Sequence, residues 1–472
     1  SSTLVRNLHN HSSYSLFALD SWDPTSSPDC CLWEGVICST SKQVVTGLQL
    51  GSLVSSDDFQ PIPFPSLVLS PLFTITTLMF LDLSSNHIVG QLPPDMFTNL
   101  TKLVHLDLME NNFTAPIPEG IFHLKYLQYL DVSTNSLSGE LSNDVGLLNN
   151  LKVLKLDYNS LSGSIPVEVG DLVNLQNLTL RANKLVGGIP SSIMGLTGLH
   201  ELDLRDNALS MEIPSDIGEL TNLTTLALSN NRLVGGITPS LQRFGKLRTL
   251  RLERNFLTGP IPLWLFQMEN LKDLFLGGNN LTWDNQVQDL EPKCMLSKLS
   301  MKSCGMAGLI PKWIATQTNL DLLDLSQNNL QGPYPKWLAE MGLGSVILSD
   351  NNLTGSLPPV LFESLNLSVL ALSRNNLSGE LPDNFGNANE IMILMLAEND
   401  FSGRIPESIS QIYRLLLLDL SGNRFTGTVP AFDPDGLLAY VDFSYNQLSG
   451  DIPVSFSTET MILSMGSNKF SG

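Results

Sequence analysis

An asparagine recurs every 24 residues through the centre of this chain and closes the phrase LxxLxLxxN each time. A fixed period of this length predicts a solenoid, in which each repeat forms one coil of a stack. The full series, here called the asparagine ladder, has 17 positions, one of them a cysteine: Asn86, Asn111, Asn135, Asn159, Asn183, Asn207, Asn231, Asn255, Asn279, Cys304, Asn328, Asn351, Asn375, Asn399, Asn423, Asn446 and Asn468.

The phrase itself explains the coil. Its leucines, such as Leu151, Leu154 and Leu156, point inward along a short strand. Lys155 points outward, because side chains alternate across a strand. One coil cannot bury its own apolar edge, so stacked coils form a parallel sheet over an apolar interior. We expect the asparagine amide to bond backbone groups that the turn would leave unpaired.

Composition limits the classes of function. Of the 472 residues, 42% are hydrophobic and 15% charged, which fits one core that grows along the stack. A net charge of −20 argues against a nucleic-acid partner, since phosphate recognition needs clustered Lys and Arg. No apolar run reaches the ~18 residues of a membrane helix, and no signal peptide opens the chain. The end, MILSMGSNKFSG, stops inside a repeat without a C-terminal cap, so we expect a trimmed segment.

A second phrase follows most ladder positions, for example LSGSIP at 161–166, LVGGIP at 185–190 and LTGPIP at 257–262. Gly permits a tight turn, and Pro fixes an extended path without needing a backbone donor. The pattern resembles the plant-specific leucine-rich repeat with its LxGxIP signature. The resemblance covers residues 44–472, about 17–18 repeats. It implies an α/β repeat fold, a right-handed solenoid with a parallel sheet on its concave face and a second short strand in each coil.

Three of the five cysteines lie in CCLWEGVIC at residues 30–38. This motif resembles the N-terminal cap of plant leucine-rich repeat proteins, which here would span residues 1–43 and cover the first coil. The resemblance implies a disulfide between Cys31 and Cys38, and it pairs Cys30 with an earlier cysteine. No cysteine precedes Cys30, so its partner stays open.

The other two cysteines, Cys294 and Cys304, lie in an irregular repeat near residues 283–304. An extended chain from 296 to 304 covers ~26 Å, far more than a disulfide tolerates. We therefore expect a buried thiol at Cys304. The segment that follows, residues 303–328, resembles a mid-solenoid block of plant receptor-like proteins.

Nine N-x-[ST] sequons indicate an extracellular glycoprotein. They begin at Asn10, Asn99, Asn112, Asn177, Asn222, Asn280, Asn352, Asn366 and Asn376. Alternatively, a repeat rich in Asn, Ser and Thr produces sequons by chance. The cysteine motif favours the first interpretation.

Patterns of catalytic residues are missing from the sequence. It holds no Gly-rich phosphate loop, nucleophile elbow or zinc-spacing motif. Only His105 and His200 among six histidines take outward strand positions, and they lie four repeats apart, too far to share a metal or a proton. We expect no enzymatic activity, no cofactor and no metal.

Information about a partner must lie at outward strand positions, because packing dictates the inward ones. Late repeats approach a default such as LDLSQN at 323–328, whereas earlier repeats carry charged and aromatic residues there. The candidate ligand-binding residues are Lys152, Lys155, Tyr158, Arg181, His200, Asp203, Arg205, Arg248, Arg251, Glu253 and Phe275. The alternative is a solvated face of mutually paired charges.

A second candidate is an insertion near residues 55–73, where 33 residues separate the first two strands. Its prolines are expected to prevent regular strand pairing. Phe59, Ile62 and Phe64 would then serve as exposed apolar anchors for a partner. Alternatively, the segment packs on its own coil.

The resemblance implies the ectodomain of a plant cell-surface receptor-like protein on the apoplastic side of the plasma membrane. It implies recognition of a microbial protein or peptide and signalling through co-receptor and adaptor kinases, with the membrane anchor outside this chain. One alternative is a soluble inhibitor of microbial wall-degrading enzymes, similar to polygalacturonase-inhibiting proteins. Another is a developmental peptide receptor or receptor-kinase ectodomain.

Overall fold

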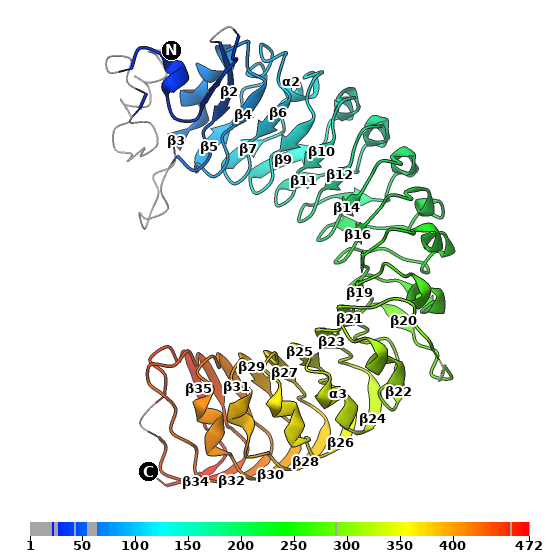
Figure 1. The fold of residues 1–472 in the computed structure, drawn as a ribbon, viewed down its shortest axis with the longest axis vertical. Helices are drawn as coiled ribbons and strands as arrows, with labels where there is room; N and C mark the ends of the chain where they lie inside the picture. Colours follow the sequence, from blue (N-terminus) through cyan, green and yellow to red (C-terminus); the bar gives the residue numbers. More distant parts are fainter. Residues whose placement is uncertain are drawn as a thin grey trace. The chain divides into compact units, whose positions relative to one another are not determined.

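The computed structural model describes residues 21–22, 27–41, 44–53, 64–287, 290–453 and 456–471. The chain divides into two compact units, Ser1–Leu247 and Arg248–Gly472. Each unit is described by itself below (Figure 1).

The main sheet of the first unit contains one short strand per coil. Strand β1 pairs antiparallel with β2, and every later neighbour pair is parallel, with equivalent residues side by side. The strands are β1 (Val36–Cys38), β2 (Val45–Gln49), β4 (Phe80–Asp82), β6 (His105–Asp107), β8 (Tyr129–Asp131), β10 (Val153–Lys155), β12 (Asn177–Thr179), β14 (Glu201–Asp203) and β16 (Thr225–Ala227).

The main sheet of the second unit is parallel and follows the same rule. Its strands are β17 (Thr249–Arg251), β19 (Asp273–Phe275), β21 (Lys298–Ser300), β23 (Leu322–Asp324), β25 (Ser345–Ile347), β27 (Val369–Ala371), β29 (Ile393–Met395), β31 (Leu417–Asp419), β33 (Tyr440–Asp442) and β35 (Ile462–Ser464).

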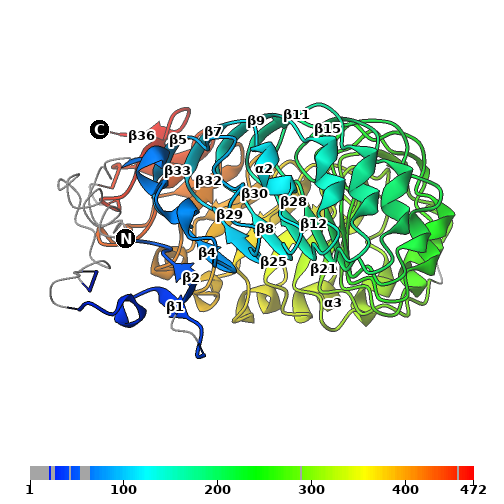
Figure 2. The same ribbon diagram turned by 90° about the horizontal axis from the view of Figure 1, so that it is seen from above.

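A second set of strands begins just after the ladder positions, as the LxGxIP phrase predicts. Figure 2 separates β5, β7, β9 and β11 from β4, β8 and β12 of the main sheet. In the first unit these strands are β3 (Phe64–Pro65), β5 (Ile88–Gln91), β7 (Asn112–Ala115), β9 (Ser136–Glu140), β11 (Ser160–Ser162), β13 (Val186–Gly187) and β15 (Ala208–Leu209). In the second they are β18 (Thr258–Pro260), β20 (Asn280–Thr282), β22 (Ala307–Gly308), β24 (Asn329–Pro333), β26 (Asn352–Gly355), β28 (Asn376–Glu380), β30 (Asp400–Arg404), β32 (Arg424–Gly427), β34 (Gln447–Gly450) and β36 (Lys469–Phe470).

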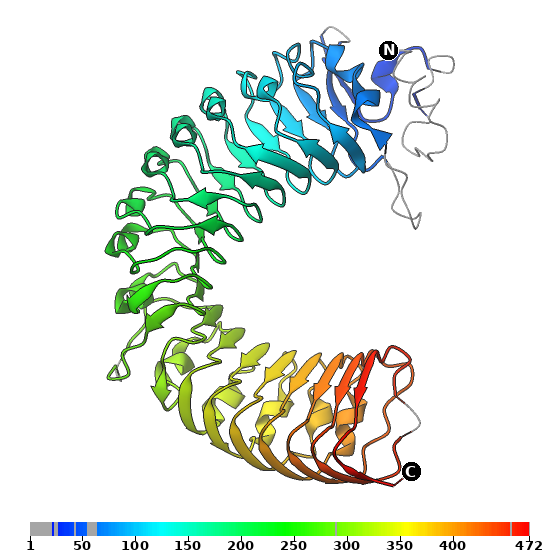
Figure 3. The same ribbon diagram turned by 180° about the vertical axis from the view of Figure 1, so that it is seen from behind.

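Short helical turns close most coils, and those of consecutive coils stack on one another (Figure 3). Two are α-helical, α2 (Glu119–Phe122) and α3 (Lys336–Glu340). The 3-10 helices are η2 (Cys30–Leu32), η3 (Ser66–Leu69), η4 (Leu72–Thr74), η5 (Asn143–Leu147), η6 (Val167–Asp171), η7 (Ser191–Gly195), η8 (Ile217–Glu219), η9 (Pro239–Arg243), η10 (Leu263–Gln267), η11 (Lys312–Thr316), η12 (Pro359–Glu363), η13 (Phe385–Asn387) and η14 (Glu407–Gln411). Many follow the extended proline of LxGxIP, as Pro166 precedes η6.

The asparagine ladder forms the predicted bonds. The Asn231 amide donates to the carbonyl oxygens of Leu204, Leu228 and Ser229 at 2.9, 3.1 and 3.2 Å. Its Oδ1 accepts from the Leu209 amide at 3.0 Å. One side chain thus joins its own turn to the coil before it, while leucines fill the interior. These features confirm the predicted leucine-rich repeat solenoid.

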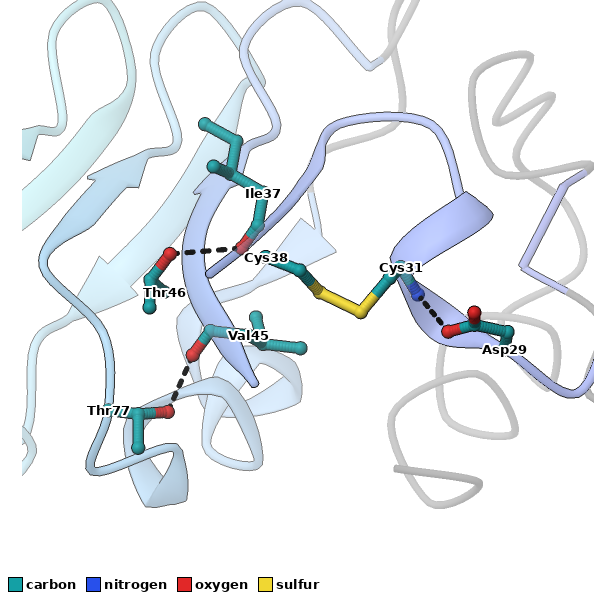
Figure 4. The surroundings of a disulfide bond; sticks show 7 residues. All are labelled: Asp29, Cys31, Ile37, Cys38, Val45, Thr46 and Thr77. Carbon is teal, nitrogen blue, oxygen red and sulfur yellow. Dashed lines mark hydrogen bonds between the residues drawn. A yellow bond between two sulfur atoms is a disulfide. The ribbon is translucent and has the colours of Figure 1, made fainter. Parts of the chain in front are cut away.

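The cap covers the first coil through a disulfide and two indoles. Cys31 and Cys38 are joined, with Cα atoms 5.7 Å apart, and Asp29 accepts a hydrogen bond from the Cys31 amide at 2.9 Å (Figure 4). Trp22 and Trp33 are buried against each other with ring centroids 5.4 Å apart. Cys30 is a free, half-buried thiol. Burial of both rings gives β1 and β2 an apolar cover at the end of the stack.

Cys294 and Cys304 are also free, and both are buried, as expected from the length of chain between them. Burial raises the pKa of the Cys304 thiol to about 12. These sulfur atoms therefore behave as small apolar groups in the core.

The insertion behaves differently from the prediction. Phe59 and Ile62 lie outside the described residues, but Phe64 and Pro65 form β3 and pair in parallel with β5. The prediction that its prolines prevent strand pairing was wrong here, because a two-residue pairing at the edge of the second sheet needs few backbone donors. Leu69, Leu72 and Phe73 are buried, whereas Leu67 is 64% exposed. The described part therefore packs mainly on its own coil.

Candidate ligand-binding face

The outward residues of each main sheet form one surface, called here the exposed face. In β12, for example, Asn177 and Thr179 point to the side opposite the buried Leu178. Arg181 follows on the same side, after the buried Leu180. The repeat thus places a first, a third and a fifth outward residue at fixed positions on every coil.

A cluster that contains two of the predicted residues, Tyr158 and Arg181, crosses four coils of the first unit. The Arg181 guanidinium lies over the Tyr158 ring, 5.1 Å from its centroid. Its Nε donates to Asp206 Oδ2 at 2.8 Å, and Asn230 Nδ2 donates to Asp206 Oδ1 at 2.6 Å. These four residues, Tyr158, Arg181, Asp206 and Asn230, are called the central cluster. Its tyrosine is 48% exposed, so an aromatic surface remains available to a partner.

Asp157 anchors the central cluster from below. It accepts hydrogen bonds from the Thr179 hydroxyl and from the Arg181 backbone amide, the latter at 2.7 Å. Burial raises the pKa of this carboxyl, although both hydrogen bonds act in the opposite direction. Asp157 therefore orients Arg181 and has little surface of its own for a ligand.

Asp203 and Arg205 form an internal pair. Arg205 Nε donates to Asp203 Oδ1 at 2.9 Å, and its second nitrogen, Nη2, lies 2.5 Å from Oδ2. Asp203 is buried. The pairing that the alternative interpretation expects is present here, so Asp203 can orient Arg205 but offers little contact area itself.

Other predicted residues lie at the margin of the exposed face. Lys152, His200 and Arg248 are exposed, and each precedes its strand by one residue. Lys155 belongs to β10 and lies 3.5 Å from Asp131 Oδ2. All except Arg248 belong to the first unit.

The second unit contains a small group of its own. The Arg251 guanidinium lies over the Phe275 ring, 4.2 Å from its centroid, and 3.6 Å from Glu253 Oε1. All three residues are half-buried. The predicted residues therefore contribute to separate local groups, namely the central cluster and the Asp203–Arg205 pair in the first unit and the Arg251 group in the second.

Sequence reasoning missed an aromatic stack near the start of the first unit. The rings of Phe80, His105 and Tyr129 occupy the first outward position of β4, β6 and β8. Neighbouring centroids are 4.3 and 4.2 Å apart, and both pairs are within 9° of parallel. These three residues are called the aromatic ladder. Its signal was present in three consecutive phrases, FLDL, HLDL and YLDV, but only the histidine was considered.

A row of acids runs beside the aromatic ladder at the third strand position: Asp82, Asp107 and Asp131, called here the acid row. Burial raises the pKa of Asp107 to about 6, with smaller contributions from its two acidic neighbours. Burial lowers the pKa of His105. Near neutral pH the imidazole is therefore largely uncharged, so the acid row is not neutralised by the histidine.

The late repeats carry more than the default sequence. Their first outward position is apolar in five consecutive strands, with half-buried or exposed side chains at Val369, Ile393, Leu417, Tyr440 and Ile462. The default interpretation considered only the LDLS portion and overlooked this row. Nothing on these strands indicates what would cover the row.

The sequon asparagines, with Asn10 outside the described residues, lie mostly on exposed turns and at the start of second-set strands. Asn177 is different, because it belongs to β12 and its amide donates to Glu201 Oε2 at 2.7 Å on the exposed face. A glycan at Asn177 would occupy the ligand face beside the central cluster. Which sequons carry glycans remains a prediction.

Among the described residues, Asp29, Cys30 and Cys31 are the one group with metal-ligand geometry. The Cys31 sulfur is in a disulfide, so this group lacks a free third ligand. No described helix is both long and apolar enough to cross a bilayer.

Known families match four parts of the chain. They are described as leucine rich repeat N-terminal domain at residues 4–39, leucine rich repeat at 76–137 and 366–388, and leucine-rich repeat region at 145–341. Receptor-like protein 46 of Arabidopsis thaliana is 47% identical over 125 residues, which are 26% of this chain and 14% of that protein. The chain thus spans a small part of this relative.

Solved structures extend the similarity over nearly the whole chain. The ectodomain of the receptor kinase GASSHO1/SCHENGEN3 from Arabidopsis thaliana, in complex with CASPARIAN STRIP INTEGRITY FACTOR 2, has a TM-score of 0.70 and 30% identity, over 96% of this chain and 59% of that one. The plant peptide hormone receptor RGFR1, in complex with RGF2, has a TM-score of 0.66 and 30% identity, over 94% of this chain and 73% of that one. These ectodomains are a ligand-binding fold without enzymatic activity. The chain belongs to the plant leucine-rich repeat receptor-like proteins.

Proposed function

We propose that this chain is the extracellular ligand-binding part of a plant receptor-like protein, and that it binds a peptide or an extended protein segment. The observation that carries the proposal is the central cluster, where non-consensus side chains cross four neighbouring coils on the exposed face. An extended ligand that crosses the strands would meet one such side chain about every 4.8 Å.

The chemistry of this face suits such a ligand. Tyr158 offers a partly exposed ring, and Arg181 is held in place by Asp206. Tyr and Arg, together with Trp, are the residue types most enriched at the hot spots of protein interfaces. Because Arg181 is already ordered, binding loses less side-chain entropy than it would with a free arginine. The similar structures of HAESA with the peptide hormone IDA and of the plant peptide hormone receptor RGFR1 with RGF2 support the same class of partner.

We further propose that the ligand is derived from a microbe and that signalling passes through partner receptor kinases. The family resemblance of residues 303–328 to plant receptor-like proteins implies this origin, and the similarity to receptor-like protein 46 supports the receptor-like class alone. A second candidate is an endogenous peptide, because the structure of the receptor kinase HAESA, for example, contains the peptide hormone IDA and the co-receptor SERK1. An inhibitor of wall-degrading enzymes is a third, less supported candidate.

A photo-crosslinking experiment tests the binding face. Tyr158 is replaced by p-benzoylphenylalanine, and Tyr413, which is 56% exposed and precedes β31, is replaced in a matched control. Both proteins are incubated with apoplastic fluid from infected and from uninfected plants. We expect a crosslinked peptide at Tyr158 alone. A peptide present only in infected tissue supports microbial perception, and one present in both supports an endogenous ligand.

The crosslinked peptide is then synthesised and titrated by calorimetry. Replacing Arg181 with Ala removes its contacts with Tyr158 and Asp206 and should weaken binding about tenfold. Arg205→Ala tests the Asp203–Arg205 pair, and Arg251→Ala tests the group of Arg251, Phe275 and Glu253 in the second unit. Unchanged affinity in all three folded variants would reject the predicted ligand-binding role of these outward residues. Tight binding to a purified polygalacturonase instead would favour the inhibitor.

A further inference from the structure

The aromatic ladder is a continuous ring surface on the exposed face. Phe80, His105 and Tyr129 lie directly beside one another in the parallel register of three strands. All three side chains are half-buried, so their edges reach the solvent. The residue paired with Phe80 in the neighbouring strand β2 is Gly47, which has no side chain. The ladder therefore ends at a position where no side chain of β2 projects.

The acid row lies on the same face, two residues farther along each strand. Asp82 Oδ1 accepts from the Ser84 amide at 2.9 Å, and Asp107 Oδ1 accepts from the Met109 amide at 3.0 Å. These bonds fix the carboxyl orientation. In the part of the chain that the structure describes, neither Asp82 nor Asp107 has an ion-pair partner or a hydrogen bond to Oδ2.

Tyr129 of the aromatic ladder and Asp131 of the acid row show which kind of group this arrangement can bind. The Lys155 ammonium lies 5.7 Å from the centroid of the Tyr129 ring and 3.5 Å from Asp131 Oδ2. A cation of the chain itself is thus held by one ring and one carboxylate at the end of the two rows. His105 with Asp107, and Phe80 with Asp82, repeat the ring and carboxylate at the same strand positions without such a cation.

We propose that the aromatic ladder and the acid row form a binding site for arginine or lysine side chains of an extended ligand. Carboxylates attract the cation, and the exposed ring edges supply apolar contact to its aliphatic stem. A planar guanidinium suits the site best, since it can donate to two carboxylate oxygens in a fixed geometry. This site is separate from the central cluster and does not depend on the proposed receptor role.

The charge of the surroundings favours the same occupant. Glu110, three residues after Asp107, adds a further acid to the same coil and accepts a hydrogen bond from Ser85. Lys155 is the one basic side chain that the structure pairs with the acid row. An anionic ligand would face the carboxylates of Asp82 and Asp107, and a purely apolar ligand would leave them without partners. Asp131, in contrast, is buried and already paired with Lys155.

The test uses a defined probe, a fluorescein-labelled peptide Ac-(Gly-Arg)3-amide, titrated by fluorescence anisotropy at low salt. Its partner probe contains citrulline instead of arginine, which keeps the planar shape and hydrogen bonding but loses the charge. We expect the arginine peptide to bind about tenfold tighter than the citrulline peptide. Equal binding of the two peptides would overturn the proposal.

Matched variants separate this site from general attraction to a chain of net charge −20. Asp107→Asn removes one acid of the row and keeps the oxygen that accepts from Met109. Asp419→Asn removes one acid in the second unit, where Oδ1 accepts from the Ser421 amide at 3.1 Å and the first strand residue is Leu417. We expect about a fivefold loss of affinity for the first variant and less than a twofold loss for the second. Equal losses would refute the site.

A ring variant tests the second half of the proposal. Phe80→Leu removes the ring at the Gly47 end of the aromatic ladder but keeps an apolar side chain, and Tyr440→Leu removes a comparable ring in β33. Only Phe80→Leu should weaken the arginine peptide, by about threefold. Circular dichroism and thermal melts confirm that each variant is folded. If neither ring variant changes binding while Asp107→Asn does, the carboxylates act alone and the ladder has no binding role.

Discussion

Replacing Asn231 with Ala should destabilise the first unit severely. This residue of the asparagine ladder is 7% exposed, and its amide donates to three backbone carbonyls in two coils. Its Oδ1 also accepts from the Leu209 amide at 3.0 Å. Alanine fits the space but supplies none of these bonds, and little water can reach the groups left behind.

The magnitude follows from those hydrogen bonds. The amide has only two hydrogens, so its three donated contacts count as two bonds, and the Oδ1 bond makes three. A net value of about 1 kcal/mol for each gives about 3 kcal/mol, and unsatisfied buried groups cost no less. Asn174→Ala is the matched control, because its amide makes one exposed hydrogen bond, to the Asn149 carbonyl at 2.8 Å. We expect the control to lose less than about 1 kcal/mol. The difference between the two variants should therefore be about 2 kcal/mol or more.

Urea denaturation followed by tryptophan fluorescence measures both variants against the parent chain. Coils of a solenoid contact only their neighbours, so the unfolding curve of Asn231→Ala should show an early phase that the control lacks. If both variants unfold within about 1 kcal/mol of each other, the ladder bonds contribute no more than a surface contact. In that case the periodic asparagine would have to be explained by turn propensity alone.

Asp107→Asn should raise the melting temperature at pH 7.5 but not at pH 4, because the folded pKa of about 6 lies above the ordinary 3.8. Ionising this carboxyl costs stability as pH rises through that window, by about 1 kcal/mol after allowance for its partial exposure, and equal shifts at both pH values would contradict this. Cys31→Ser should cost about 2 kcal/mol by opening the short loop to Cys38, which limited proteolysis of the cap measures. Alkylation of the native protein at pH 8 should label Cys30 long before Cys304, since the latter is buried with a pKa of about 12, and mass spectrometry of the labelled peptides would expose the reverse order.

The fold could be predicted from the sequence because every repeat places its buried and exposed residues in the same pattern. Each coil repeats the same inward leucines, so Leu154 and its equivalents could be assigned to the core without knowing any long-range contact. The same logic failed at β3, where Pro65 pairs with Val89 although proline was expected to prevent pairing. An irregular segment has no second copy against which its pairing can be checked.

The candidate site was only partly readable. Outward positions were identified correctly, since Tyr158 and Arg181 do lie together. Their pairing could not be predicted, because it depends on rotamers that cross strands, such as the contact between Arg181 and Asp206. The aromatic ladder was missed for another reason. Its members differ in type, and only the parallel register shows that a phenylalanine, a histidine and a tyrosine form one stack.

We expect the two proposed binding surfaces of the first unit, the central cluster and the acid row with its aromatic ladder, to contribute differently to ligand binding. In the central cluster the arginine already has an acidic partner, so a ligand gains shape and ring contact more than net charge. In the acid row, Asp82 and Asp107 keep one oxygen without a described partner, so a cation there would satisfy groups that the fold leaves open. Affinity for a basic residue should therefore arise over β4 and β6, and discrimination by shape over β10 to β16. A ligand with one arginine placed several residues from an aromatic or apolar side chain would use both surfaces at once.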